Sequence, residues 1–448
     1  MSRYTAVTDQ DLREMLDAIG VDSLDDLFDD VPEAVRLERA IDLPDGRSEQ
    51  EVYDHLAALA ARNVHADAEV SFVGAGMYDH YVPALIDTLL GRSEFLTPYT
   101  PYQPEVSQGG LQVMFEYQTA ISELTGLPVS NASVYEGPSA VAAAGYLAKL
   151  ETRRTKLIAS RGLHPHSRAA LATHAVGYGM EVVEVPLDEN GVTDLEALAG
   201  AVDDDSAAVF VQQPNFLGSV EELGELVEAG KSTGAMFVCA ADPLPLGILR
   251  PPGELGVDVC VGEGQTLGNR LDFGGPSFGF FAAAERFIRR MPGRIAGQTT
   301  DLDGKRGFVL TLQTREQHIR REKATHNICT AQALNALAGV VYLSWLGKRG
   351  LVELGELMLR RTHYARGELG LEPINPGPVM REFAVRVPDV DGLFERARAD
   401  GINPGYRLGR DYPEYEDGLL VAITERRTKE HIDRLARVAA ATREGVAA

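Results

Sequence analysis

The stretch AAVFVQQPNFLGSVEELGELVEAGKSTGAMFVCAADPLPLG, residues 207–247, decides the expected fold. It opens with the apolar run AAVFVQQPN (207–215) and ends with a second one, MFVCAAD, followed by PLPLG. Continuous apolar runs of this length are typical of strands that are buried on both faces of a parallel sheet. A helical segment between two such strands supplies the crossover that parallel pairing needs.

The same alternation extends outward to about residues 130–285. Further apolar runs are KLIAS (156–160), EVVEVPL (181–187), VDVCVGEG (257–264) and SFGFFAA (277–283). Helical runs such as SAVAAAGYLAKLETRR separate them, so the centre of the chain is predicted to be an α/β domain with a mainly parallel sheet. After residue 310 the pattern is strongly helical, and the tail alternates two strands with two helices.

We therefore expect three parts. Residues 1–60 form an N-terminal helical arm, residues 61–325 a large α/β domain, and residues 326–448 a helical connection with a small C-terminal α+β domain. The length of 448 residues suits a large domain with smaller attachments.

The charge balance argues against several kinds of partner. The net charge is −23, with acidic runs such as DSLDDLFDD and only seven lysines. Such a chain would repel phosphate backbones and anionic membranes, so neither nucleic acid nor membrane is an expected partner. An acidic, lysine-poor surface also favours a halophilic protein, because concentrated salt screens the repulsion between its charges.

The sequence also predicts the compartment. No run approaches the roughly 20 apolar residues of a membrane helix, and the start, MSRYTAVTDQDLREMLDAIG, is acidic and amphipathic, unlike a secretory signal. Cys239, Cys260 and Cys329 form neither a CxxC pair nor a disulfide framework. We expect a cytoplasmic protein with reduced thiols and without a metal site.

Two candidate ligand contacts follow the early strands, where open α/β sheets bind their ligands. The turn that leads into a helix at Ser139 could hold a phosphate with its free amides and helix dipole, although a helix cap at Ser139 is the simpler interpretation. His166, in the sequence His-Pro-His after KLIAS, could stack on a planar cofactor or move protons, or the two histidines could be surface or capping residues.

Two more candidates follow the later strands. Asp242 comes directly after MFVCAA, where a buried carboxylate needs a partner such as a protonated ring nitrogen, although Asp-Pro also opens ordinary turns. The loop GEGQTLGNRLDFGGPSFGFFA (262–282) contains Gly274, Gly275 and Pro276. Glycines at this density suggest backbone close to a ligand or to another chain, or else a tight structural loop.

Several long motifs resemble one family of enzymes. They are FLTPYTPYQPEVSQGGLQVMFEYQTAISELTGLPVSNASVYEG (95–137), DPLPLG (242–247), GEGQTLGNRLDFGGPSFGFFA and REQHIRREKATHNICTAQAL (315–334). Together with the order of phosphate turn, histidine, aspartate and glycine loop, they resemble glycine dehydrogenase (decarboxylating), the P-protein of the glycine cleavage system. The resemblance covers the chain from the arm to its end and is closest to subunit 1 of the two-subunit form.

The resemblance implies the type I fold of pyridoxal-phosphate-dependent transferases. It also implies that this chain lacks the covalent bond between a lysine and the cofactor. In the catalytic subunit of this family a His-Lys-Thr sequence precedes the Gly-rich loop, and its lysine forms the Schiff base with the cofactor. Here Gln265 stands in its place. An amide nitrogen is not a nucleophile, so the usual bond is excluded, and Ser139, His166, Asp242 and Gln265 would be the remnants of a cofactor pocket.

The resemblance also implies partners. A lysine-bearing subunit 2 would carry pyridoxal phosphate, decarboxylate glycine as glycine dehydrogenase (aminomethyl-transferring), and pass the aminomethyl group to the lipoyl arm of the H-protein, in an expected α2β2 complex. This chain would complete the site at the interface. The residues expected to contribute are Tyr99, Tyr102, Gln103, Glu105, Gly274, Gly275 and Pro276.

Two other functions stay open at this point. The chain could be a self-sufficient pyridoxal-phosphate decarboxylase that uses an out-of-place lysine. It could also be a structural or regulatory partner that keeps the fold without shaping the site.

Overall fold

A helical unit forms the first part of the chain in the computed structural model, which describes residues 6–37, 39–98, 100, 102–103, 106–275 and 277–447. This unit ends at Val64, and a second compact unit begins at His65. The first unit contains α1 (Asp9–Ile19), η1 (Asp25–Phe28), η2 (Glu33–Val35) and α2 (Glu49–Ala60). Thr8 and Ser48 begin α1 and α2 with capping boxes, each closed by an acidic side chain three residues on.

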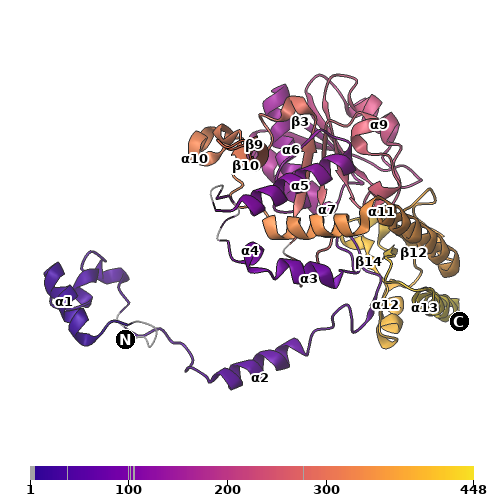
Figure 1. Cartoon of the computed structure of the whole chain (residues 1–448). Coiled ribbons are helices and arrows are strands. Elements are labelled where there is room, and N and C mark those ends of the chain that lie inside the picture. Colours follow the sequence, from indigo (N-terminus) through magenta and orange to yellow (C-terminus); the bar gives the residue numbers. More distant parts are fainter. Residues whose placement is uncertain are drawn as a thin grey trace. The chain divides into compact units, whose positions relative to one another are not determined.

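A seven-stranded sheet organises the second unit (Figure 1). Its strand order is β2-β8-β7-β6-β5-β3-β4, and the five strands from β7 to β4 in that order run parallel. The bounds are β2 (Val129–Ser130), β3 (Lys156–Ser160), β4 (Glu181–Val185), β5 (Ser206–Gln213), β6 (Met236–Ala241), β7 (Val259–Glu263) and β8 (Gly279–Ala283). The predicted mainly parallel α/β sheet is confirmed, with β8 and β2 added antiparallel at one edge.

Helices cover both faces of this sheet, which explains why the strands are apolar without alternation. Val209 and Cys239 point into a core shared with α5, α9 and α11 (Ala333–Leu369), whereas Phe210 and Val238 point into a second core shared with α6 and α7. The helices are α5 (Gln108–Thr125), α6 (Gly137–Thr152), α7 (Pro165–Tyr178), α8 (Leu195–Ala201) and α9 (Leu223–Gly230). Figure 1 shows α5 and α11 in front of the sheet.

A small antiparallel sheet with the order β11-β12-β15-β14 organises the C-terminal part, as the predicted α+β domain requires. Helix α11 (Ala333–Leu369) leads into it and is interrupted at Gly347, whose φ is 59°. The other elements are β11 (Glu372–Pro373), β12 (Glu382–Arg386), α12 (Val390–Ala399), β13 (Ile402–Asn403), β14 (Tyr406–Arg407), β15 (Gly418–Ala422) and α13 (Lys429–Ala447). The predicted domain boundaries at residues 60 and 325 stay predictions.

The helix expected from about residue 310 begins only at Ala333. Between β10 (Arg306–Thr311) and α11 lie the short turns η6 (Gln313–Arg315), α10 (Gln317–Arg320) and η7 (Arg321–Lys323). Arg315 and Glu316 are buried there, and Arg315 donates to the carbonyl oxygens of Met291 and Gly293. Glu316 pairs with Arg294 at 2.9 Å, so tertiary contacts hold two consecutive polar side chains where a regular helix was expected.

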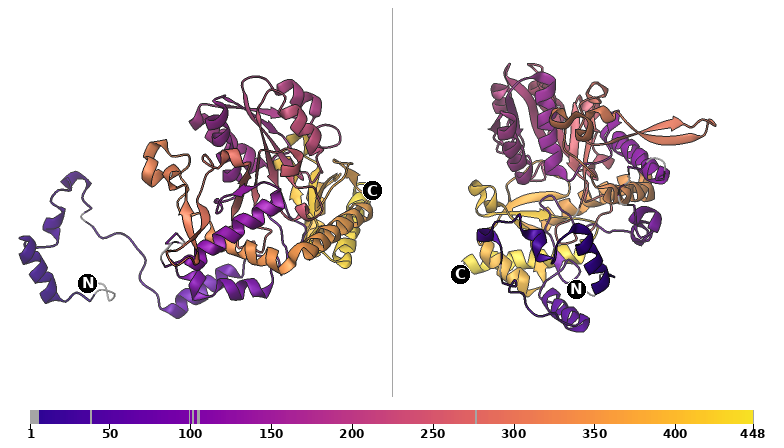
Figure 2. Two further views of the ribbon diagram at one scale, coloured as in Figure 1. Left: turned by 45° about the horizontal axis from the view of Figure 1, so that its top comes forward. Right: turned by 90° about the vertical axis from the view of Figure 1, so that its left-hand side faces the viewer.

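Short elements complete the second unit. A hairpin of β9 (Ile295–Thr300) and β10 (Arg306–Thr311) extends away from the large sheet (Figure 2). The remaining elements are β1 (Val70–Ser71), α3 (Ala84–Leu90), α4 (Ser93–Leu96), η3 (Pro245–Gly247), η4 (Pro252–Leu255), η5 (Glu285–Phe287), η8 (Leu408–Arg410) and η9 (Pro413–Tyr415). Within the described residues, no helix combines the length and apolarity that crossing a membrane takes.

Candidate functional site

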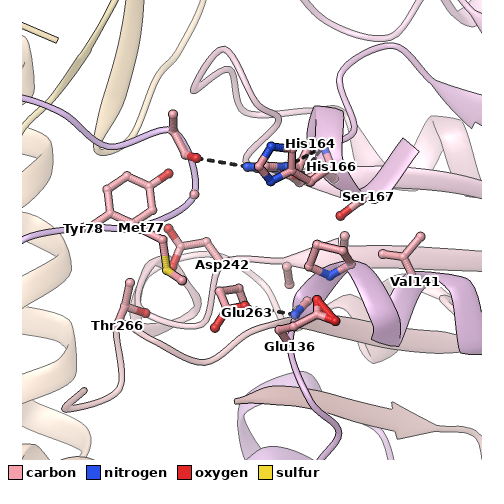
Figure 3. A pocket seen from close by; sticks show the side chains of 18 of the residues that line it. Met77, Tyr78, Glu136, Val141, His164, His166, Ser167, Asp242, Glu263 and Thr266 are labelled. Atoms are coloured by element: carbon pink, nitrogen blue, oxygen red, sulfur yellow. Dashed lines mark hydrogen bonds between the residues drawn. The ribbon is translucent and has the colours of Figure 1, made fainter. Parts of the chain in front are cut away.

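A cavity of about 410 Å³ lies at the carboxyl ends of β3, β5, β6 and β7, where a parallel sheet binds its ligands (Figure 3). The segment 75–78 and Arg381, which precedes β12, close it from the other side. Of the predicted pocket residues, His166 and Asp242 line the cavity, and Gly274 of the glycine loop joins them. No lysine is among the described residues that line it.

Gln265 is buried beside the cavity and has a structural role. Its Oε1 accepts from the backbone N of Tyr78 at 2.9 Å. Its Nε2 donates to the carbonyl oxygens of Tyr78, at 3.1 Å, and of Asn269, at 2.9 Å. One amide therefore bonds a backbone donor and two backbone acceptors, a combination that an ammonium group, with no acceptor, cannot reproduce.

Asp242 has a protein partner in the place where a ring nitrogen was expected. Arg381 forms an ion pair with its carboxylate, and the Arg381 guanidinium lies over the Tyr78 ring at 3.4 Å from the centroid. Burial disfavours the charge on Arg381, but Asp242, Tyr78 and Glu382 outweigh it and raise the pKa of Arg381. The carboxylate that would bind a cofactor ring is already neutralised.

The helix end that was expected to hold a phosphate holds two carboxylates. Glu136 is the N-cap of α6 and accepts from the backbone N of Ser139 at 3.1 Å, while Ser139 completes a capping box with the N of Glu136. The expected cap at Ser139 is thus wrong: the cap is Glu136, and Ser139 is the third helical residue. Glu263 accepts from the N of Gly137 at 2.9 Å. Figure 3 shows Glu136 and Glu263 at the same end of the cavity.

These carboxylates make the helix end unsuitable for a phosphate. The backbone donors that a phosphate would use are taken, and an anion would meet two acidic side chains. Burial raises the pKa of Glu263, although donors from Ser277, Gly137 and Gln265 favour its charged form. The residues of this chain therefore do not fit pyridoxal phosphate at its ring nitrogen, its phosphate or its point of covalent attachment.

The histidines after β3 have separate roles. His164 is the N-cap of α7: its Nδ1 accepts from the N of His166 at 3.1 Å, and its Nε2 lies 3.0 Å from the carbonyl oxygen of Ala75. Burial lowers the pKa of His164 to about 4, so this ring is neutral. The capping role that the sequence left open applies to His164, while His166 is exposed and lines the cavity.

The residues predicted at a subunit interface are only partly described. Tyr99, Glu105 and Pro276 lie outside the described residues. The Tyr102 hydroxyl donates to the carbonyl oxygen of Thr330 at 2.8 Å, and the Arg294 guanidinium lies over its ring. The carbonyl oxygen of Gln103 accepts from the N of Ser107 at 2.7 Å. Their role at an interface stays a prediction, as does that of Gly274 and Gly275.

Sequence reasoning missed the polar groups on the side of the cavity opposite the strand ends. The Tyr78 hydroxyl donates to Glu382 at 2.5 Å, and Arg381 contacts His80 at 2.6 Å. Burial raises the pKa of Glu382 to about 7. The only local signal was the pair Arg381-Glu382 at the start of the apolar strand EFAVRV, where two charged residues precede a buried run.

The fold and the position of the cavity define a class of protein, the type I fold of pyridoxal-phosphate-dependent enzymes. A solved NifS-like protein has this fold, with a TM-score of 0.62 over 84% of this chain and all of its own; at 14% identity it supports the fold alone. A solved glycine decarboxylase (P-protein) of the glycine cleavage system, in inhibitor-bound form, matches far better. Its TM-score is 0.89 at 42% identity, over 98% of this chain and 100% of that one.

Sequence comparison gives the particular family. The family model of the glycine cleavage system P-protein matches residues 2–439, so the chain belongs to that family. A probable glycine dehydrogenase (decarboxylating) subunit 1 from Carboxydothermus hydrogenoformans is 52% identical over 97% of this chain and 99% of its own length. One with the same description from Geobacillus thermodenitrificans is 50% identical over 97% and 98%. The resemblance found in the motifs is confirmed.

Proposed function

We propose that this chain is subunit 1 of a split glycine dehydrogenase and that it works without a cofactor of its own. The single observation that supports the proposal is that the chain's own side chains occupy the positions in the cavity where a cofactor would bind. Gln265 is tied to backbone groups, Asp242 is paired with Arg381, and carboxylates occupy the phosphate end. The covalent chemistry then belongs to a lysine-bearing subunit 2.

The complete reaction is the one that the family carries out. Glycine loses its carboxylate as CO2, and its remaining aminomethyl group passes to the lipoyl disulfide of the H-protein, which is reduced as glycine is oxidised. Pyridoxal phosphate, held by subunit 2, would supply the electron sink for this step. We propose an α2β2 assembly, because type I enzymes build their sites where two subunits of this fold meet.

This chain would contribute side chains and backbone to the partner's site. The candidates are Tyr99, Tyr102, Gln103 and Glu105 in one loop, with Gly274, Gly275 and Pro276 in another. Gly274 and Gly275 have φ values of 102° and 132°, which other residues rarely adopt, and Phe273 beside them is fully exposed. Such a loop can bring backbone amides close to a ligand of another chain.

Mixing experiments test the proposal. The isolated chain with pyridoxal phosphate should show no visible aldimine absorbance and no release of CO2 from glycine. Adding subunit 2 and H-protein should give glycine-dependent CO2 release that neither subunit gives alone. Glycine decarboxylation by this chain alone, or a lysine labelled by borohydride reduction, would favour the self-sufficient enzyme instead.

A second measurement separates an active contribution from scaffolding. Replacing Tyr102 by Phe removes the hydroxyl that bonds Thr330 and keeps the ring under Arg294. Replacing it by Ala removes both. If Tyr102 shapes the partner's site, the Ala variant should assemble with subunit 2 but turn over more slowly. Unchanged turnover in an intact complex would mean that this residue only supports the assembly.

A further inference from the structure

The most basic part of this acidic chain is the stretch from Arg286 to Lys323. It has ten Lys and Arg against four Asp and Glu, in a chain whose net charge is −23. Its last part, residues 317–323, comprises α10 and η7, and all of its residues are exposed. We call it the cationic turn. Figure 1 shows α10 at the periphery of the large domain, next to the hairpin β9–β10.

The cations of this turn are not neutralised within the chain. In the part of the molecule that the structure describes, the side chains of Arg320, Arg321 and Lys323 form no hydrogen bond or ion pair. By contrast, Arg286 and Arg290 of the same stretch pair with acidic side chains. Unpaired cations gathered on an otherwise acidic protein can attract an acidic surface of another molecule.

Behind the turn lie three buried polar atoms without a hydrogen-bond partner among the described residues. They are Nε of Arg294, Oγ1 of Thr325 and Nε2 of His326. The Arg294 Nη1 pairs with Glu316 at 2.9 Å, but His326 Nε2 lies 3.6 Å from the same carboxylate, too far for a hydrogen bond. Leaving buried groups unpaired costs about 1–3 kcal/mol each, so the arrangement suits a missing partner.

All three groups can act as donors. His326 accepts from the N of Ile328 through Nδ1 at 3.2 Å, so in its neutral form the proton is on Nε2. Burial, with Arg315 and Arg294 nearby, lowers the pKa of His326 to about 4 and keeps it neutral. Two N–H groups and one hydroxyl without acceptors fit a carboxylate better than any donor-bearing group.

This cluster is continuous with a residue already proposed at the interface. The Arg294 guanidinium lies 5.0 Å from the centroid of the Tyr102 ring, and Tyr102 donates to the carbonyl oxygen of Thr330, five residues beyond Thr325. The turn, the cluster and the Tyr102 loop therefore form one connected region. That continuity favours the partner subunit as the occupant.

We infer that the cationic turn and the cluster of Arg294, Thr325 and His326 form a docking surface for an acidic face of subunit 2. The exposed cations pair with acidic side chains of the partner. The three unpaired donors are covered in the isolated chain, so in this proposal the turn moves on docking and a carboxylate of the partner then reaches them. The inference rests on the proposed function, because it needs the two-subunit complex.

A charge-reversal experiment tests the turn. The variant combines Arg320→Glu, Arg321→Glu and Lys323→Glu. Its matched control combines Arg250→Glu, Arg398→Glu and Arg437→Glu, at positions whose side chains are also exposed and form no hydrogen bond or ion pair among the described residues. At low salt the dissociation constant for subunit 2 should rise at least ~10-fold in the variant and little in the control. The difference should shrink as salt is added.

A second variant tests the buried cluster without reversing a charge. Thr325→Val removes the hydroxyl and keeps the shape of the side chain. Because this hydroxyl has no partner among the described residues, the isolated chain should unfold at the same temperature or higher, while binding to subunit 2 weakens several-fold. A merely structural hydroxyl would give the opposite pattern, with lower stability of the isolated chain and unchanged binding.

The outcomes separate the inference from the proposed function. If wild-type chain and subunit 2 do not associate or release CO2 together, the proposed function fails. If they do, and the charge-reversed variant binds like its control, the docking surface is wrong. If the isolated chain self-associates and charge reversal abolishes that, the occupant is a second copy and the choice of partner is overturned.

Discussion

Gln265 is the residue on which the proposed absence of covalent chemistry depends, and its contacts predict what a lysine would do there. In Gln265→Lys, the ammonium cannot accept from the N of Tyr78, so the variant should lose about 1–3 kcal/mol of stability. It should still form no aldimine, because Asp242 and the helix end remain blocked. Thermal unfolding and visible absorbance after addition of pyridoxal phosphate measure the two effects.

Gln265→Met is the control for that substitution, since it has similar length and no charge. It should be destabilised to a similar degree without any change in absorbance. A stable visible band in the lysine variant, retained by a lysine after borohydride reduction, would show that the cavity still accepts the cofactor and would contradict our account of Arg381 and Glu263.

Glu382 gives a prediction about pH. Burial raises its folded-state pKa to about 7, from an ordinary value of 4.5. The folded state therefore holds a proton that the unfolded state releases, and this contribution to stability is present below pH 4.5 and is lost as the pH rises through 7. Glu382→Gln imitates the protonated form, so its stability relative to wild type should improve between pH 5 and pH 8, by up to ~3 kcal/mol.

Glu414 is the control for the pH experiment. Although burial opposes its charge, donation from the Arg161 guanidinium, which stays charged at every pH used, lowers the pKa of Glu414 below its ordinary value. Its carboxylate therefore stays charged from pH 5 to pH 8, and the stability difference between Glu414→Gln and wild type should be constant over that range. Denaturant unfolding at several pH values measures both differences, and a flat profile for Glu382→Gln would contradict the assignment.

At the scale of elements, the start of α6 determines whether the cavity accepts an anion. Glu136→Ser combined with Glu263→Ala should keep a helix cap while freeing the N of Gly137, because alanine has no side-chain acceptor. The exposed helix end should then bind inorganic phosphate. Phosphate at about ten times its Kd would add ~1.4 kcal/mol to the stability of this variant, seen as a higher melting temperature.

Wild-type protein and a distant double variant, Glu225→Gln with Glu228→Gln on α9, are the controls for α6. Both retain the two carboxylates at the start of α6, so phosphate should stabilise them no more than an equal concentration of chloride at matched ionic strength. An equal phosphate effect in all three proteins would mean that Glu136 and Glu263 do not exclude anions.

The elements also show how far local sequence could predict this molecule. Apolar runs such as KLIAS and MFVCAA contain their own burial signal, so the parallel strands could be predicted, and the motifs identified the family. The partner of Asp242 could not be predicted, because Arg381 is 139 residues away in the sequence and only the fold brings the two side chains together. The contact between Glu263 and the N of Gly137 at the start of α6 could not be predicted for the same reason. The helix predicted from residue 310 failed because tertiary contacts of Arg315 overrode its local pattern.

At the scale of the whole molecule, negative charge acts against the compact state. With a net charge of −23, acidic side chains repel one another on the surface, as on α9 and the residue that precedes it, where the exposed Glu222, Glu225 and Glu228 recur every three residues. This repulsion is screened within about 3 Å at 1 M salt. Added salt should therefore stabilise the folded chain, because it screens this repulsion. The same screening should weaken docking of subunit 2, which depends on attraction between opposite charges.

Raising potassium chloride from 0.1 to about 1 M should increase the melting temperature of the isolated chain by at least ~2 °C, because screening of surface repulsion should be worth about 1 kcal/mol or more. A triple variant with Gln at positions 222, 225 and 228 has less repulsion to relieve, so its salt-dependent increase should be smaller. An equal increase in both proteins would assign the effect to salt-strengthened burial of apolar surface, since potassium chloride would then act on the core that the two share.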